Sequence, residues 1–250
     1  GAIAADHLYG RAERGFTAAG TSGNSLVANT TVNTVDVELS DTGDITLAFT
    51  GAVILEHVQT FDGAIVILAS GDVIAEWVKT SGTSERNDIS ITVFPSVNGG
   101  SHTAANLTVE NVTAGGAGDI TLYVEGVISQ LIGLISGDQL TVTVAAGLTL
   151  RTSVNAISIQ TLAAGNVTLT QTGRSKLTLQ QIFISDGSLT VVADSTVEVV
   201  DVVLDKDGIH DAETDTWTPY VASIDTTGAS GAGDILIRKL HFSGQPVSTG

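Results

Sequence analysis

Internal repetition is the feature that most constrains how this chain can fold. Residues 31–51 align without a gap with residues 153–173, and seven positions of that alignment are identical. A third copy lies 75 residues after the first, where the sequence GDITL of residues 43–47 recurs at residues 118–122. Strand starts are predicted at residues 45, 53, 65 and 73, and again at 120, 128, 140 and 148. Steps of eight and twelve residues indicate a unit of twenty residues.

Within each unit the hydrophobic residues alternate with Thr, Ser or acidic residues, as in Asp44-Ile45-Thr46-Leu47 and Leu140-Thr141-Val142-Thr143-Val144. This period of two, in β-branched residues, is typical of strands with one buried face and one wet face. A unit of twenty residues is too short to bury its own apolar face and has to stack on its neighbours. The sequence therefore predicts an all-β protein, a parallel β-solenoid (β-helix), in which Ile45 and Leu47 point inward and Thr46 points to water.

An antiparallel β-sandwich is the alternative fold, because short strands separated by turn residues fit that architecture as well. Two observations favour the solenoid. Hairpin signals such as Asn-Gly or Asp-Gly between alternating runs are few, and a sandwich has no reason to repeat at twenty residues. The segment from Ala4 to Arg14 is the one window where a helical turn or two is expected.

The charge balance excludes several classes of function. The chain holds 27 acidic and 10 basic residues, a net charge of −17, so it repels nucleic acids and anionic membrane surfaces. No apolar run is long enough for membrane insertion. Because cysteine is absent, disulfides, thiol catalysis and Cys-ligated metal sites are excluded.

Four segments are predicted along the chain: residues 1–30 as an N-terminal cap or linker, 31–204 as solenoid repeats, 205–232 as an acidic loop insertion, and 233–250 as a terminal strand and tail. The chain opens with glycine and holds no methionine, which predicts a processed or excised product. The last alternating run, Asp234-Ile235-Leu236-Ile237-Arg238, has no obvious polar cap behind it. We therefore expect flanking repeats in a longer parent chain, or end-to-end self-association into a filament.

Phrases such as TGDITLAFTGAV, VNAISIQTLAAGNVTLTQTG and SDGSLTVVADSTVEVV resemble the β-strand repeats of large bacterial exoproteins of the filamentous-haemagglutinin kind. The resemblance covers residues 31–203, with an echo at residues 231–240, and consists of the pattern G-[DN]-[IV]-T-L after VN-x-[IV]. It implies a secreted, extracellular or cell-surface β-helical rod that serves as an adhesin, a matrix component or a stalk, with host or matrix glycans as partners. The repeats of that class carry no catalytic residues, so none is transferred.

The acidic insertion holds the sharpest local motif, with Asp205, Asp207, Asp211 and Glu213 placed around a glycine and Asp215 in reserve. Calcium takes six to eight oxygen ligands, which such a loop can supply. The stretch is similar to the D-x-D-G-I-x-D-x-E loops of bacterial thrombospondin-type-3-like calcium repeats. The sequence predicts a calcium site here, with a solvated acidic loop as the alternative interpretation.

A β-helical enzyme that cleaves polysaccharides is the main rival function, and it requires paired carboxylates with an aromatic platform. Asp36 and Glu38 point the same way along one strand, and Glu198 projects from another. Asp36 and Glu38 are outward positions, where a solvated face also places acidic residues, and His57 is expected at a surface or corner. We therefore expect a structural and adhesive protein rather than an enzyme. The aromatic candidates for stacking on sugars are Trp77, Trp217 and Tyr220.

Overall fold

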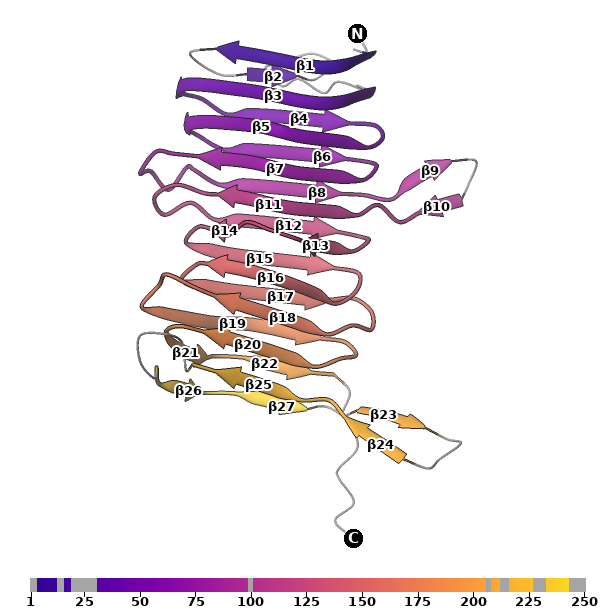
Figure 1. Cartoon of the computed structure of the whole chain (residues 1–250), viewed down its shortest axis with the longest axis vertical. Coiled ribbons are helices and arrows are strands. Elements are labelled where there is room, and N and C mark those ends of the chain that lie inside the picture. The colour runs from indigo at the N-terminus through magenta and orange to yellow at the C-terminus, as the bar shows by residue number, and fades with distance from the viewer. Residues whose placement is uncertain are drawn as a thin grey trace.

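A computed structural model describes residues 4–12, 16–18, 31–98, 101–205, 208–211, 216–226 and 233–242. These residues form strands, turns and bends without any helix. No helix able to cross a membrane is found among them. The strands stack into one long rod with the N-terminal strand at one end (Figure 1), so the predicted all-β solenoid is confirmed.

Two parallel sheets form the walls of the rod. The first sheet contains β1 (Ala4–Ala12), β3 (Thr31–Thr42), β5 (Val53–Asp62), β7 (Val73–Thr80), β11 (Leu107–Thr113), β13 (Ile128–Gln130), β14 (Ile135–Ser136), β16 (Leu148–Ser153), β18 (Val167–Gln171), β20 (Leu189–Ala193) and β25 (Ala222–Asp225). The second contains β2 (Phe16–Ala18), β4 (Ile45–Phe49), β6 (Ile65–Ala69), β8 (Ile89–Val93), β12 (Ile120–Val124), β15 (Gln139–Val144), β17 (Ala156–Thr161), β19 (Lys176–Ile184), β21 (Thr196–Val199), β22 (Val202–Leu204), β26 (Ile235–Ile237) and β27 (Leu240–Phe242).

The chain alternates between the two sheets, so each coil contributes to both walls and pairs in register with the coils above and below. Ile45 pairs with Ile65 and Val53 pairs with Val73, each partner being twenty residues away. The predicted strand starts and the twenty-residue unit are therefore confirmed in these coils. A β-sandwich is ruled out, because every pairing within the two large sheets of the described residues is parallel.

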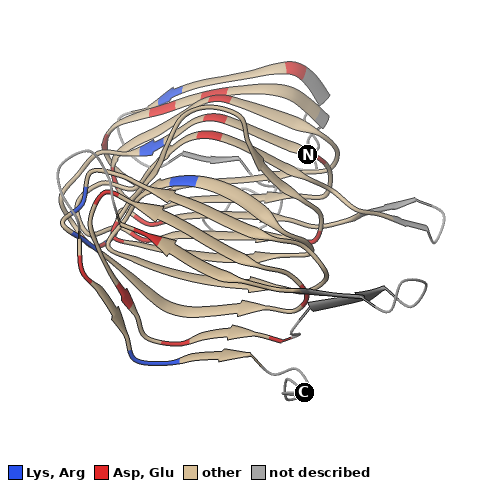
Figure 2. Ribbon diagram, turned by 60° about the horizontal axis from the view of Figure 1, so that its bottom comes forward, with Lys and Arg blue, Asp and Glu red and all other residues tan. Residues whose placement is uncertain are grey.

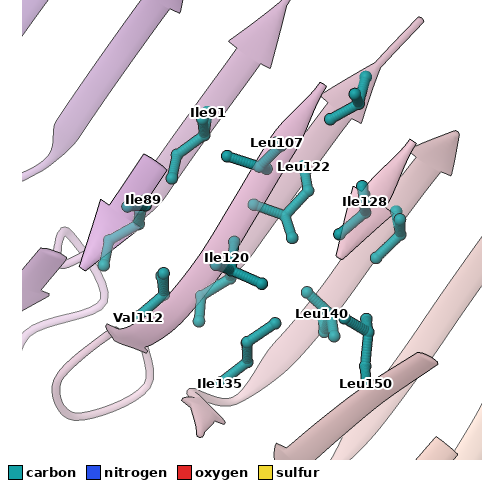
Figure 3. Packing of buried hydrophobic residues seen from close by; sticks show 14 of the residues in the cluster. Ile89, Ile91, Leu107, Val112, Ile120, Leu122, Ile128, Ile135, Leu140 and Leu150 are labelled. Atoms are coloured by element: carbon teal, nitrogen blue, oxygen red, sulfur yellow. The ribbon is translucent and has the colours of Figure 1, made fainter. Parts of the chain in front are cut away.

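The core is a stack of aliphatic layers between the two sheets. Ile89, Ile120 and Leu140 lie at successive levels of the second sheet, and each is at most 1% exposed. Residues of the first sheet such as Leu107 and Ile128 face them across the rod (Figure 3). Burying a side chain of this size stabilises the fold by about 1.5–3 kcal/mol. Stacking therefore supplies the stability that a single coil lacks.

Buried polar side chains satisfy the backbone where the chain turns from the first sheet to the second. The Thr60 hydroxyl donates to the Gly43 carbonyl oxygen at 2.7 Å. Farther along, Gln171 Nε2 donates to the Val154 carbonyl oxygen at 2.7 Å, and Gln171 Oε1 accepts from the Thr152 hydroxyl at the same distance. A buried carbonyl without a partner costs about 1–3 kcal/mol. These side chains therefore supply hydrogen-bond partners for the buried backbone carbonyl groups at the turns.

The N-terminal strand corrects one expectation, because Ala4–Ala12 is strand β1 and not a helix. It pairs in parallel with β3, so that Leu8, Gly10 and Ala12 lie over inward-facing residues of the next coil. Strand β2 pairs with β4 in the same way. Pairing with an existing strand edge satisfies the backbone and buries Leu8 in part, which outweighs the weak local preference of so short a helix.

The two repeats of the sequence relate to the fold differently. Shifting by 75 residues carries β4 onto β12, and both belong to the second sheet. Shifting by 122 residues carries β4 onto β18, which belongs to the first sheet. The longer repeat is therefore out of phase by half a coil. The two walls are similar enough in sequence that one half-coil can take the place of the other.

Two antiparallel hairpins interrupt the regular coils. Strands β9 (Ser96–Asn98) and β10 (Ser101–Thr103) form the first, and β23 (Gly208–Asp211) and β24 (Thr216–Pro219) form the second. Both lie where the chain passes from the second sheet back to the first, and they project from the same side of the rod (Figure 1). The second hairpin lies within the predicted insertion of residues 205–232, and the first was not predicted.

Candidate functional site

The turns from the second sheet to the first form one long edge of the rod, which we call the groove edge. Asp72 Oδ1 accepts a hydrogen bond from the Asn106 backbone NH at 2.8 Å. Asn106 Oδ1 in turn accepts from the Val127 backbone NH at 2.9 Å. Each side chain thus binds the coil that follows it. The contact recurs farther along, where Asn166 Oδ1 accepts from the Ser188 NH at 2.9 Å and the Ser188 hydroxyl accepts from the Val221 NH at 3.0 Å.

Glycine allows the backbone of neighbouring coils to approach closely at this edge. Gly165 has a φ of +154°, and a Cβ atom built there would lie 2.1 Å from the Gly147 backbone nitrogen. No side chain fits at that distance, so a glycine is required at residue 165 for the two coils to pack this closely. The same two glycines line hollows in the surface at this edge.

Three shallow hollows follow one another along the groove edge and share residues. The first, about 450 Å³, extends from Asp72 to Ser129 over β7, β11 and β13. The second, about 380 Å³, extends from Ile128 to Asn166 and includes Thr149. The third, about 410 Å³, extends from Ala164 to Tyr220. Ser129 lines the first two and Asn166 lines the last two. We call the series the edge groove.

Both hairpins join the rod beside the edge groove. After β10 the chain re-enters the first sheet through Asn106, which lines the first hollow. After β24 it re-enters through Pro219 and Tyr220, which line the third. The Tyr220 hydroxyl donates to Asp186 Oδ1 in the turn of the preceding coil, and this bond raises the pKa of the tyrosine hydroxyl. One hairpin therefore stands near each end of the groove.

The opposite edge, where the first sheet passes to the second, uses carboxylates for the same contacts, and we call it the acidic edge. Asp88 Oδ1 accepts from the Asp119 NH at 2.9 Å, and Asp119 Oδ1 accepts from the Gln139 NH at 3.1 Å. Partial burial raises the pKa of Asp119, and the nearby carboxylates of Asp88 and Asp138 raise it further. The bond from Gln139 opposes that rise. Stacking acidic residues on successive coils therefore has an electrostatic cost.

The acidic residues that an enzyme would need are held in ion pairs. Asp36 Oδ1 lies 2.8 Å from Arg11 Nη1, and Glu38 Oε2 lies 3.1 Å from Arg11 Nε. The Arg11 guanidinium also lies over the ring of Tyr9, 4.7 Å from its centre. His57 Nδ1 is 3.3 Å from Asp36 Oδ1. The hydrogen bond from Arg11 lowers the pKa of Asp36, which makes this carboxyl a poor proton donor.

Glu198 lies far from that cluster, on β21 near the other end of the rod (Figure 1). It is 5% exposed and bridges Lys176 of the preceding coil and Arg238 of the following one. Hydrogen bonds from these two bases lower its pKa. The structure therefore does not bring Glu198 together with Asp36 and Glu38, and each acidic residue joins neighbouring coils instead.

The aromatic candidates are dispersed. Trp77 lies on the outer face of β7, 41% exposed, with the Lys79 ammonium 5.9 Å from its ring centre. Tyr220 lines the edge groove. Trp217 belongs to β24, and its side chain lies outside the described residues.

The predicted calcium ligands fall largely outside the described residues. Asp207 and Glu213 lie in undescribed segments, and Asp211 is placed only by its backbone at the end of β23. Asp205 is exposed directly after β22. Among the described residues no group of three or more acidic or histidine side chains is arranged to hold a metal ion. The calcium site therefore stays a prediction.

The edge groove was not predicted, although the sequence contains a pattern of residues that indicates it. An Asp, Asn or Ser precedes many strands of the first sheet, and a Thr or Ser stands at the second position of β11, β13, β16, β18 and β20. Only the register places these residues on one edge. The chain matches no protein-family model, no curated protein and no solved structure. Function is therefore inferred from the groove and from the ends of the rod.

Proposed function

We propose that this chain is a structural and adhesive segment of an extracellular β-solenoid protein, which extends by stacking on further coils. The observation that carries the proposal is the exposure of core positions at the C-terminal end of the described rod. Ile235 and Ile237 pair with Val197 and Val199, which are fully buried, yet the two isoleucines are 43% and 51% exposed. These are core positions that await a covering layer.

The backbone at the two ends supports the same proposal. Among the described residues, β25, β26 and β27 end the sheets at one end of the rod, and β1 and β2 end them at the other. Each outer strand has one row of NH and CO groups that no described strand pairs with, which is a template for a further strand. Because all described pairings within the two large sheets are parallel and the two ends differ, contact between copies would be head to tail and would grow a filament. In a longer chain, the next coil would occupy the same place.

Light scattering across a range of protein concentrations tests this proposal. The average mass is expected to rise with concentration for the wild type. Ile237→Lys should abolish that rise, because a charged side chain at a core position of the outer strand blocks stacking. Leu236→Lys is the matched control, since Leu236 is also 51% exposed but pairs with Glu198 on the outer face. A rod that stays monomeric at every concentration, or that associates equally with Lys at residue 237, would contradict end-to-end stacking.

A further inference from the structure

We propose that the edge groove binds a single extended chain of an uncharged polysaccharide, which lies along the axis of the rod. This names the ligand for the adhesive part of the proposed function and rests on that part. It is independent of stacking at the ends, because the groove is built within one chain.

The shape of the groove favours a long, narrow ligand. Its three hollows are joined through Ser129 and Asn166 and extend along the edge from β7 to Tyr220, which precedes β25. Exposed Val127 and Val221, at 46% and 52%, stand at turns along the same edge. Apolar carbon at such positions can pack against the faces of sugar rings while the polar groups bind their hydroxyls. A compact ligand would occupy one hollow, whereas a chain can occupy all three.

Hydroxyl groups are presented at the spacing of the coils. Thr149 lines the second hollow. Its register partners on the next two strands, Thr168 and Thr190, continue this outward row beside the groove without lining a hollow. In the described part of the chain their side chains make no hydrogen bond, so each hydroxyl is free to donate and to accept. Neighbouring strands lie about 4.8 Å apart. This spacing is close to the length of one sugar unit, so a polysaccharide along the axis would meet a hydroxyl at each coil.

Red acidic segments predominate over blue basic ones along the described coils (Figure 2), and the charges of the groove argue against an anionic ligand. No Lys or Arg lines the three hollows, and the net charge of −17 repels polyanions. The two acidic residues that line the groove are already engaged. Asp72 Oδ1 accepts from the backbone and the side chain of Asn106, and Asp186 accepts from the Tyr220 hydroxyl. Neutral hydroxyl and amide groups therefore remain to select the ligand, and they fit uncharged sugars.

Both ends of the groove are marked by the hairpins. Strands β9 and β10 join the rod at Asn106, and β23 and β24 join it at Tyr220. Because both hairpins project from the groove side of the rod (Figure 1), they flank the path of the bound chain. Tyr220 also places an aromatic ring at one end, where a terminal sugar can stack.

Affinity electrophoresis in native gels tests the proposal. The gels contain hydroxyethyl cellulose, glucomannan or soluble amylose, with dextran sulfate as the charged comparison. We expect at least one uncharged polymer to retard the wild-type protein. Thr149→Trp should weaken that binding at least about tenfold, because a bulky ring fills the second hollow, while the control changes it less than about twofold. The control is Thr121→Trp, an equally outward threonine on β12 of the opposite sheet.

Circular dichroism first establishes that both variants fold. Absence of retardation by all three uncharged polymers, equal weakening by the two variants, or stronger retardation by dextran sulfate would each overturn the proposal. Neither threonine lies at an end of the rod. Light scattering on the same proteins therefore separates a failure of polysaccharide binding from a failure of end-to-end stacking.

Discussion

The two edges of the rod perform the same structural task with different chemistry. At each edge a side chain in one coil accepts a backbone NH of the next coil, as Asp88 does on the acidic edge and Asn106 does on the groove edge. The acidic edge places carboxylates on successive coils, and the pKa of Asp119 is raised there. The groove edge uses amides and a hydroxyl at most of its contacts, with Asp72 as an exception.

We propose that this difference separates the edge that mainly holds coils together from the edge that binds a ligand. A carboxylate accepts a backbone NH strongly, but it repels its neighbours on adjacent coils. An amide or hydroxyl makes the same contact without charge and keeps a donor for other partners. The acidic edge contributes to the net charge that keeps rods apart sideways. The groove edge carries the hollows and both hairpins.

The largest expected effect comes from filling the tight turn of the groove edge. Gly165→Ala should destabilise the rod by roughly 3 kcal/mol or more, because the new Cβ atom collides with the backbone of the preceding coil. Urea unfolding measures the change. The control is Gly173→Ala on the acidic edge, where φ is +73° but the nearest atom is 3.5 Å away. That variant should lose about 1–2 kcal/mol from backbone strain alone. Equal losses would mean that collision of the new Cβ atom with the neighbouring coil adds nothing to the backbone strain.

A smaller effect is expected from placing a carboxylate on the groove edge. Asn106→Asp keeps the acceptor for the Val127 NH but removes the amide that donates to Asp72 Oδ1 at 3.3 Å. Two carboxylates would then face each other, so stability should fall by roughly 1 kcal/mol at neutral pH. Added salt should restore part of the loss by screening the repulsion. Thermal unfolding at two salt concentrations measures both changes. If the loss of stability does not depend on salt, repulsion between the two carboxylates is not its cause.

The reverse exchange on the acidic edge should stabilise the rod slightly. Because the folded state raises the pKa of Asp119, the folded rod holds that proton more tightly than the unfolded chain does. The stabilising contribution of the protonated carboxyl is present at low pH and is lost as the pH rises through the folded pKa. Asp119→Asn keeps the acceptor for the Gln139 NH and removes the charge. It should gain a few tenths of a kcal/mol at pH 7, since the side chain is exposed and screened.

That gain should shrink as the pH falls, because wild-type Asp119 then becomes protonated as well. Urea unfolding of both proteins between pH 7 and pH 3 measures it. If the gain in stability is unchanged over this pH range, or if the variant is less stable at pH 7, repulsion among the stacked carboxylates of the acidic edge does not lower stability.

The coil was predictable because its signal is local and repeated. Alternation at Ile45, Thr46 and Leu47 sets which face is buried, and the twenty-residue spacing sets which strands become neighbours. β1 was harder to predict, since Ala4–Ala12 becomes a strand by pairing with β3, a long-range contact that local preference does not report. The first hairpin was missed for a related reason. Its short strands lie in an insertion that lengthens one coil to 31 residues between Ile89 and Ile120.

The residue types of the candidate site are visible in the sequence, but their common position on one edge is not. Asp72, Asn106 and Asn166 stand far apart in sequence, and unequal coil lengths hide their common position. The acidic residues that could have formed a catalytic pair stand out in the sequence by their charge. In the structure, however, Asp36 and Glu38 form ion pairs with Arg11. Outward acidic residues join coils, whereas the hollows are lined mainly by neutral residues and glycines, which carry little signal in a single sequence.

Successive coils stack in register, and because the chain contains no cysteine, introduced cysteine pairs can test this register directly. Thr149 and Thr168 are register partners on β16 and β18, so their Cα atoms should lie within the range of about 4.4–6.8 Å that a disulfide spans. The variant with Thr149→Cys and Thr168→Cys should form an intramolecular disulfide under mild oxidation. A second variant with Thr149→Cys and Thr190→Cys spans two coils, roughly 9.6 Å, and should not. Failure of the first pair to form a disulfide, or equal disulfide formation in both variants, would contradict the stacked solenoid.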